Sequence, residues 1–299
     1  MNRPSVVFMG KKTWSARALR HLVDMRWDVR AVVCREPWEE LDRDEGTLKE
    51  AARELRIPTL SETDLYPCLA GKLRRGIRWD GVDYVVSYLF WRKIRAPLLA
   101  LPSRGAINFH PAPLPDLRGL GGYNVAILER MRRYGVTAHF MVESIDAGDV
   151  IRTRRFAIKP DVETAVSLER RSMEEMLRLF VDVMRIPTRG RSLPRRPQGK
   201  GRYIDRAEFE RMRRITAEDP PEVVERKCRA FFFPPHDGAF VELGGKEFTV
   251  ISPSVLEFIG ERLRLSLGGR HEESSRDRGR RVHRQSELVA QPPTGTANA

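Results

Sequence analysis

Residues 107–119 read INFHPAPLPDLRG, and this stretch decides how the rest of the chain is interpreted. Its first part belongs to a short apolar run, Gly105–His110, which is typical of a buried strand. Asn108 and His110 stand two residues apart in this extended segment, so their side chains lie on one face of a sheet. Three prolines follow at once and restrict the backbone of the next loop. The pattern predicts an amide and an imidazole held side by side where a strand ends.

Strand-like and helix-like segments alternate on both sides of this stretch. Such alternation predicts an α/β fold with a Rossmann-like, mostly parallel sheet, in which ligands bind beyond the carboxyl ends of the strands. Residues 105–110 would end at such a point. Strands are expected at 5–10, 28–34, 82–89, 105–110, 135–141 and 148–158, and helices at 14–25, 46–57 and 163–184.

The composition changes after the last of these helices. Residues 185–206 carry eight Lys or Arg against one Asp, with Pro and Gly throughout, which is typical of a linker or a basic loop. Alternating segments around Gly244-Gly245 then predict a hairpin. For the 299 residues we expect a catalytic domain over 1–185, a basic linker over 186–200, a small α+β module over 201–267 and a disordered tail over 268–299.

The formal net charge of +13 favours a phosphate-bearing or nucleic-acid partner, although solvated basic surfaces are common. Three scattered cysteines predict a reducing, cytoplasmic location without a disulfide framework. No apolar run approaches the roughly 20 residues that span a bilayer, so no membrane contact is expected. The isolated histidines and scattered carboxylates indicate no metal site.

Three carboxylates in the segment ESIDAGDVI are candidates to act together with His110: Glu143, Asp146 and Asp149. An Asn amide and a protonated His can both donate to a developing oxyanion, and a carboxylate near the His can tune it and help to move a proton. Asp146 could instead be a turn residue that bonds its own backbone. No G-x-G-x-x-G follows the first strand, which argues against NAD or FAD, and no nucleophilic Ser or Cys motif appears.

Three ordered segments carry a family resemblance over about residues 5–185. The segments are VVFMGKKTWSARALRHLV, INFHPAPLPDLRG and GVTAHFMVESIDAGDVI. Together they resemble the folate-dependent formyltransferases, a family that includes methionyl-tRNA, glycinamide ribonucleotide and amino-sugar N-formyltransferases. The resemblance implies an N-formyltransferase with 10-formyltetrahydrofolate as formyl donor. It also implies a catalytic trio of Asn108, His110 and Asp146, with His139 as structural support.

The resemblance further implies where the two substrates bind. The pterin ring would lie against strand-end loops, and the amine substrate would enter near the opening stretch. The implied cofactor-binding residues are Ser87, Tyr88, Leu89, Phe90, Leu114, Val142 and Ile145. By their place in and after the opening stretch, the candidate substrate residues are Arg118, Tyr123 and Asn124.

The acceptor amine is predicted from departures within the family. The segment LPDLRGLGGYNVAI lacks the longer insertion usual in the methionyl-tRNA enzymes, and the C-terminal module looks too short for their RNA-binding barrel. We therefore expect a small biosynthetic amine, such as a nucleotide-linked amino sugar. The alternatives are methionyl-tRNA, for which the basic charge speaks, a 10-formyltetrahydrofolate hydrolase with water as the nucleophile, and a folate-binding protein without transfer activity.

Overall fold

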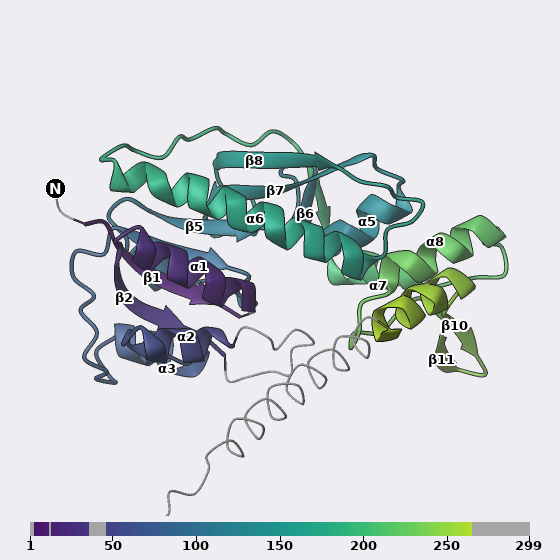
Figure 1. The fold of residues 1–299 in the computed structure, drawn as a ribbon, viewed down its shortest axis with the longest axis horizontal. Coiled ribbons are helices and arrows are strands. Elements are labelled where there is room, and N and C mark those ends of the chain that lie inside the picture. The colour runs from purple at the N-terminus through teal and green to yellow at the C-terminus, as the bar shows by residue number, and fades with distance from the viewer. Residues whose placement is uncertain (1–2, 12, 36–45, 265–299) are drawn as a thin grey trace, which may run out of the picture. The chain divides into compact units, whose positions relative to one another are not determined.

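A computed structural model describes residues 3–11, 13–35 and 46–264 of the chain. Within these residues the central sheet has seven strands in the order β3-β2-β1-β4-β5-β7-β8 (Figure 1). The first five in this order are parallel, and β7 and β8 are antiparallel to their neighbours. The predicted Rossmann-like fold class is thereby confirmed. The strands are β1 (Ser5–Gly10), β2 (Asp28–Val33), β3 (Thr59–Leu60), β4 (Tyr84–Tyr88), β5 (Gly105–His110), β7 (Arg133–Phe140) and β8 (Val150–Ala157).

One face of the sheet is covered by α1 (Thr13–Asp24), α2 (Leu48–Glu54) and α6 (Ala165–Thr188). The α6 helix begins at Thr164, whose side chain accepts a hydrogen bond from the backbone of Ser167, an N-cap that satisfies an otherwise unpaired donor. Its Phe180 lies among the rings of Phe8, Tyr88 and Phe109, with centroid separations from 4.9 to 6.0 Å. This aromatic cluster fixes α6 against the middle of the sheet.

The opposite face is covered by α3 (Glu62–Leu69) and α4 (Ala96–Leu99), which pack on a second apolar cluster. Side chains alternate along β5, so Ile107 and Phe109 belong to the α6 face, whereas Ala106 belongs to the second cluster. Asn108 and His110 therefore point to the α3 side of the sheet. Neither α3 nor α4 was predicted, because both are short and α3 contains Pro67.

The segment after the sheet differs from its predicted linker. The α6 helix continues to Thr188, so the first residues of the expected basic linker are helical. Further on, β9 (Arg202–Ile204) pairs in parallel with β6 (Leu117–Gly119), which forms the end of the opening stretch. The chain beyond α6 thus returns to the loop that follows β5.

The α5 helix (Gly122–Leu128) lies between β6 and β7. The elements after β9 are α7 (Arg206–Arg213), α8 (Pro221–Phe231), β10 (Phe240–Leu243) and β11 (Lys246–Thr249). The predicted hairpin is confirmed, with both Gly244 and Gly245 at positive φ. However, contacts group residues 1–250 into one compact unit, because β9 pairs with β6 and α8 packs on α5. The boundary expected near residue 201 therefore differs from the structure.

The second unit begins at Ile251, and its described part contains a helix over residues 253–264. The predicted disordered tail over 268–299 lies outside the described residues.

Candidate active site

The site is built on β5, at the point where the strand ends. Asn108 lies beside Ser87 of β4 and His139 of β7, and His110 lies beside Thr137. The tight pairing on both sides fixes the backbone from which the amide and the imidazole project. His110 is buried, with 8% of its surface exposed.

Asp146 reaches this pair from the loop between β7 and β8. Its Oδ2 lies 3.5 Å from Nδ1 of His110, and its Oδ1 lies 3.4 Å from Nε2 of His139. The backbone N–H of Gly119 donates to Oδ2 at 3.1 Å. Asp146 has a positive φ of 52°, an uncommon backbone conformation for a residue with a side chain. The structure thus brings Asn108, His110 and Asp146 together, with His139 as a fourth member.

Gly119 has to be a glycine for this contact to form. Its φ is +81°, and a Cβ atom at this position would stand 2.5 Å from the carbonyl oxygen of Ile204. Only a glycine allows β9 to approach so closely while its own N–H points at Asp146.

The hydrogen bonds of His110 define its tautomer. Nε2 lies 3.1 Å from the carbonyl oxygen of Leu117, and this oxygen can only accept, so Nε2 carries the hydrogen. In the neutral ring Nδ1 then has a free lone pair directed at Asp146. Burial lowers the pKa of His110, although the Asp146 carboxylate opposes this effect. The ring is therefore neutral at pH 7 and can accept a proton at Nδ1.

Asp146 stays ionised in spite of its burial. Desolvation raises its pKa, but the positive charge of His110 in its protonated form, the contact with His139 and the Gly119 N–H outweigh this and lower the pKa to about 2. A permanent carboxylate beside a neutral imidazole is a pair that can take up and release one proton.

His139 links Asn108 to Asp146. Its Nδ1 donates to the carbonyl oxygen of Phe140 at 2.8 Å, and its Nε2 faces both Oδ1 of Asp146 and the Asn108 amide. Nδ2 of Asn108 lies 3.2 Å from this Nε2. The ring is almost fully buried, with 2% exposed. This geometry fits the supporting role expected for His139, and it orients the Asn108 amide.

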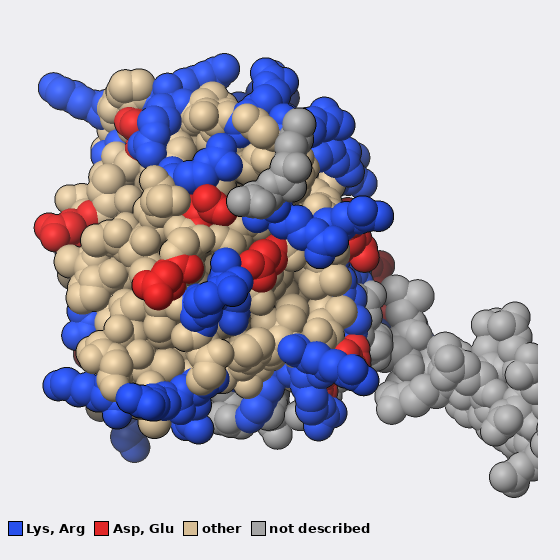
Figure 2. All heavy atoms as spheres, turned by 90° about the vertical axis from the view of Figure 1, so that its left-hand side faces the viewer, with Lys and Arg blue, Asp and Glu red and all other residues tan. Residues whose placement is uncertain are grey.

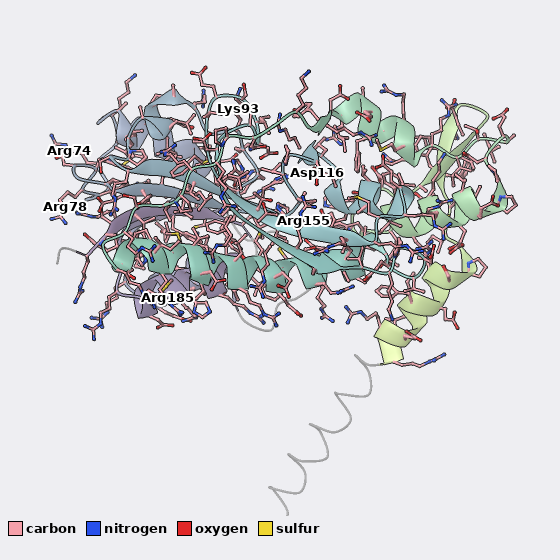
Figure 3. All side chains as sticks on the ribbon, turned by 90° about the horizontal axis from the view of Figure 1, so that it is seen from above. Arg74, Arg78, Lys93, Asp116, Arg155 and Arg185 are labelled. Atoms are coloured by element: carbon pink, nitrogen blue, oxygen red, sulfur yellow. The ribbon has the colours of Figure 1, made fainter. Side chains whose placement is uncertain are left out.

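The proline-rich loop after β5 is held from β7 and β8. The Thr137 hydroxyl donates to the carbonyl oxygen of Ala112 and accepts from the N–H of Leu114, both at 3.0 Å. Farther along the loop, Asp116 forms an ion pair with Arg155 of β8 at 2.8 Å (Figure 3). These contacts stiffen the loop that follows His110.

A pair of side chains that includes one from the basic segment holds the Asp146 turn, and no sequence pattern predicts this contact. Nε2 of Gln198 donates to the carbonyl oxygens of Asp146, at 3.0 Å, and Gly148. Oε1 of Gln198 accepts from Nε and Nη2 of Arg118, at 3.3 and 3.0 Å. We call Gln198 and Arg118 the Asp146 clamp. Arg118 also donates to the carbonyl oxygen of Gly199 at 2.9 Å. In this structure its guanidinium group therefore holds Gln198 in place.

The expected donor-binding residues fall into two groups. Val142 and Ile145 are apolar but 48% and 47% exposed, next to Asp146, as a binding surface for a flat ring would be. Leu89 follows β4 with a positive φ of 62°, and the Tyr88 carbonyl is occupied by the Ser15 hydroxyl. The buried or partly buried members are Ser87 beside Asn108, Tyr88 in the core on the α6 face, Phe90 on the second apolar cluster and Leu114 in the proline-rich loop.

Two of the expected substrate residues, Tyr123 and Asn124, make contacts within the protein interior. Tyr123 packs against Tyr134 with its hydroxyl group buried, and it joins the core on the α6 face. Nδ2 of Asn124 donates to the carbonyl oxygen of Ala230 at 2.7 Å and ties α5 to α8. Neither position supports contact with a substrate. Both residues lie on α5, where Asn124 is buried and Tyr123 is partly buried. The pattern GLGGYNVAI did not indicate that these two side chains would face the interior.

Two exposed apolar side chains adjoin the β6–β9 pair, which contacts Asp146 through Gly119. Leu120 and Tyr203 are 44% and 50% exposed, and both adjoin the β6–β9 pair that carries Gly119. Sequence reasoning missed Tyr203, because the segment GKGRYIDR has no strand pattern of its own. Within the described residues no cluster of three or more His, Cys, Asp or Glu could hold a metal ion, and no helix there has the length and hydropathy to cross a membrane.

An Asn, a His and an Asp converge at a strand end of this Rossmann-like sheet, an arrangement whose chemistry can stabilise an oxyanion and move a proton. The Formyl transferase family profile matches residues 5–184, which include this cluster and all seven strands of the sheet. A methionyl-tRNA formyltransferase from Myxococcus xanthus is 31% identical over 258 residues, covering 82% of this chain and 78% of that protein. The chain therefore belongs to the formyl transferase family, and it is an N-formyltransferase by class.

Solved structures show the same fold. A 4-N formyltransferase from Francisella tularensis has a TM-score of 0.65 at 18% identity, covering 83% of this chain and 97% of that one. An N-formyltransferase from Helicobacter canadensis, in complex with folinic acid and dTDP-3-aminofucose, has a TM-score of 0.63 at 18% identity, covering 82% and 86%. At this identity the likeness concerns the fold.

Proposed function

We propose that the chain transfers a formyl group from 10-formyltetrahydrofolate to the primary amine of a small molecule, and that a nucleotide-linked amino sugar is the acceptor class. The observation that carries the reaction is the geometry of Asn108, His110 and Asp146. An amide donor, a neutral imidazole and an ionised carboxylate converge at one strand end.

Each residue has a defined task in this reaction. The amine nitrogen bonds to the formyl carbon, whose oxygen takes the charge of a tetrahedral intermediate. Nδ2 of Asn108 donates to this oxyanion, a contact worth a factor of about 10² to 10³ in rate. The proton lost by the amine is held by the pair of His110 and Asp146, and the resulting imidazolium adds positive charge near the oxyanion.

The second half of the reaction returns the proton. The bond between the formyl carbon and N10 of the folate breaks, N10 takes the proton from His110, and the carbonyl of the formamide forms. The proton balance closes with tetrahydrofolate and the formylated amine as products. Asp146 stays ionised throughout, as its lowered pKa requires.

The donor fits the residues around Asp146. Val142 and Ile145 offer exposed apolar surface, and the backbone after β4 offers polar groups at the adjoining strand end. The Helicobacter canadensis relative was solved with folinic acid and a nucleotide-linked amino sugar, which supports the same pair of substrates here.

The small acceptor is supported by the C-terminal elements of the first unit. Between residues 201 and 250 the structure describes two helices, a two-stranded hairpin and β9, and among these residues no barrel is closed. Tyr203 and Leu120 are exposed beside the β6–β9 pair that contacts Asp146 through Gly119, and exposed side chains of this kind suit a sugar or a base.

Methionyl-tRNA is the second candidate. The Myxococcus xanthus relative carries that name, and the net charge of +13 would attract RNA. Competition decides between the candidates: the enzyme is given 10-formyltetrahydrofolate with an equimolar mixture of nucleotide-linked amino sugars and methionyl-tRNA, and the formylated product is identified by mass spectrometry. A formylated sugar nucleotide supports the proposal, and formylmethionyl-tRNA as the sole product contradicts the acceptor class.

A further inference from the structure

The basic segment over residues 185–206 divides into two parts with different partners. In the second part Arg195 pairs with Asp149 at 3.6 Å, Arg202 pairs with Glu208 at 2.6 Å, and Gln198 belongs to the Asp146 clamp. In the first part, Arg185, Arg189 and Arg191 have no carboxylate within ion-pair distance among the described residues. Arg195 and Arg202 of the second part are therefore paired with carboxylates of the chain, whereas the three arginines of the first part are not.

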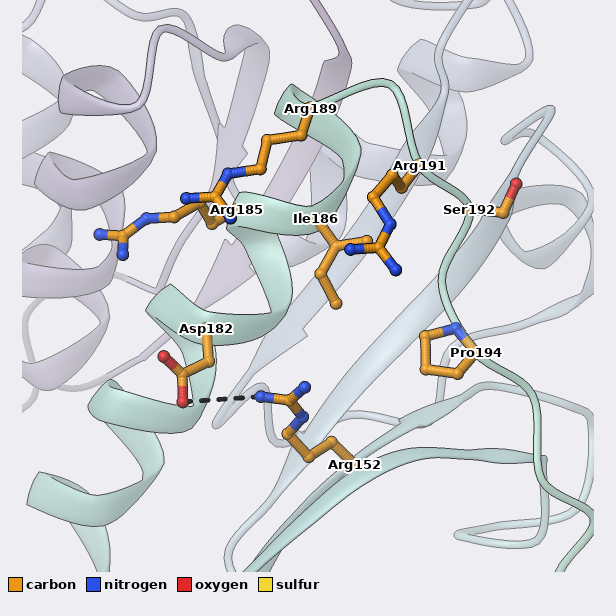
Figure 4. Close-up of a pocket in the computed structure, with 8 residues that line it drawn as sticks. All are labelled: Arg152, Asp182, Arg185, Ile186, Arg189, Arg191, Ser192 and Pro194. Carbon is orange, nitrogen blue, oxygen red and sulfur yellow. Dashed lines mark ion pairs between the residues drawn. The ribbon is translucent and has the colours of Figure 1, made fainter.

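These three arginines line a cavity of about 410 Å³ at the C-terminal end of α6 (Figure 4). The volume falls in the range of small-molecule sites. Arg152 of β8 is a fourth arginine in the lining, and Asp182 is its one carboxylate. The remaining lining residues are Ile186, Ser192 and Pro194.

The positive charge of the arginines around the cavity is not fully neutralised by carboxylates. Arg152 and Arg191 extend toward Ile186 from opposite sides, whereas Arg185 and Arg189 leave the end of the helix on its other flank (Figure 4). Asp182 lies 3.8 Å from Arg152, a loose contact, and it is shared with Arg154 at 3.7 Å. One shared carboxylate does not neutralise four guanidinium groups.

The end of α6 offers only a partial counter-charge. A helix C-terminus carries about half a negative charge, which explains one basic residue in the last turn. Its carbonyl groups are already engaged, because the N–H groups of Arg189 and Gly190 donate to Ile186 and Pro187. The surrounding face adds further positive charge: Lys and Arg side chains gather on the side of the molecule where α6 ends (Figure 2).

The cavity is separate from the candidate active site. It lies at the end of α6, on the face covered by α1, α2 and α6, whereas Asn108 and His110 point to the face covered by α3 and α4. In Figure 3, Arg185 lies on the side of α6, and Asp116 of the proline-rich loop lies across the sheet from it. An anion in the cavity is therefore not the acceptor in reaction position.

We propose that this arginine cavity binds a small polyphosphate anion, such as the diphosphate or triphosphate group of a nucleotide. Planar guanidinium groups match phosphate oxygens in pairs, so Arg152 and Arg191 would hold the phosphates while Arg185 and Arg189 add positive charge nearby. Ile186 and Pro194 supply an apolar floor beside the charges. The site stands apart from the proposed formyl transfer and does not depend on it.

Calorimetric titration of the full chain with inorganic tripolyphosphate tests this proposal. We expect saturable binding with one site per chain, weakened about tenfold or more in Arg191→Gln and in Arg152→Gln. Arg191→Lys keeps the charge but loses the planar fork, and we expect it to bind more weakly than the unaltered chain. Arg170→Gln is the matched control, since Arg170 is exposed on the same helix, outside the cavity lining, and we expect no change.

Asp182→Asn tests whether the arginines serve a ligand or only the ion pair with Asp182. If an anion enters the cavity, removal of the opposing carboxylate tightens tripolyphosphate binding severalfold. Thermal melting of each variant reports whether the fold is kept. Absence of saturable tripolyphosphate binding, or equal binding by Arg191→Gln and the unaltered chain, overturns the proposal. Binding of an RNA duplex but not of tripolyphosphate, lost in Arg191→Gln, also overturns it and assigns the surface to RNA.

Discussion

Gln198→Ala removes the clamp that holds Asp146 in its left-handed turn. Two hydrogen bonds to the carbonyl oxygens of Asp146 and Gly148 are lost, and Arg118 loses its acceptor. A neutral hydrogen bond contributes about 1 kcal/mol, so the turn loses about 2 kcal/mol of support. The left-handed conformation itself costs about 1 to 2 kcal/mol, which this support offsets.

The expected result is a loss of turnover. If the full 2 kcal/mol is lost from the positioning of Asp146, kcat falls about thirtyfold. The pH dependence changes as well, because Asp146 raises the pKa of His110 from its burial-lowered value. With Asp146 displaced, the acid limb of the pH–rate profile moves to lower pH, whereas a general loss of stability would not move this limb.

The assay follows tetrahydrofolate release with saturating donor and the acceptor that supports turnover. Arg196→Ala is the matched control, since Arg196 holds Val150 through its backbone alone and this bridge survives the change. Arg118→Ala acts on the same clamp, so its effect and that of Gln198→Ala combine less than additively. A Gln198→Ala enzyme with activity within twofold of the unaltered chain and an unchanged acid limb would refute the positioning role.

Four further changes test the site and the fold. Asn108→Ala removes an oxyanion donor and lowers kcat about 10² to 10³-fold in steady-state assays, and a smaller loss than tenfold contradicts its role. Asp146→Asn removes the charge that raises the pKa of His110, so the acid limb of the kcat/KM profile shifts to lower pH; an unmoved limb argues against the pairing. Thr137→Val leaves the N–H of Leu114 without its acceptor and lowers the free energy of unfolding by about 1 to 3 kcal/mol in urea titrations, an effect that Thr153→Val, on an edge of the same network, should not match. Phe180→Ala opens the aromatic cluster under α6 and costs about 3 to 5 kcal/mol in the same titrations, and a loss below 1 kcal/mol would show that the cluster does not anchor the helix.

Much of the sheet could be predicted from the sequence, because its inner strands are buried on both faces. The residues of β1 are all buried, and such a strand appears as a continuous apolar run. Asn108 and His110 could be placed on one face by their spacing alone. The α3 and α4 helices were missed, since short helices give few turns of periodicity.

The completion of the site could not be predicted from spacing. Asp146 was one of three carboxylates in its segment, and only the resemblance singled it out. The contacts that position it come from Gly119, 27 residues earlier, and from Gln198, 52 residues later. The Gln198 contact depends on the pairing of β9 with β6, a tertiary arrangement that local sequence patterns do not indicate. Tyr123 and Asn124 illustrate the converse, since proximity in sequence to the site did not bring their side chains into it.

The central claim is that Asn108, His110 and Asp146 transfer a formyl group to a small amine. The most direct test measures tetrahydrofolate release from 10-formyltetrahydrofolate by absorbance, with and without a panel of amines, for the unaltered chain and Asp146→Asn. We predict release that depends on a small amine, such as a nucleotide-linked amino sugar, and that falls to a small residual rate in Asp146→Asn. Release that proceeds equally without any amine would indicate a hydrolase, and release that Asp146→Asn retains would contradict the account of the site.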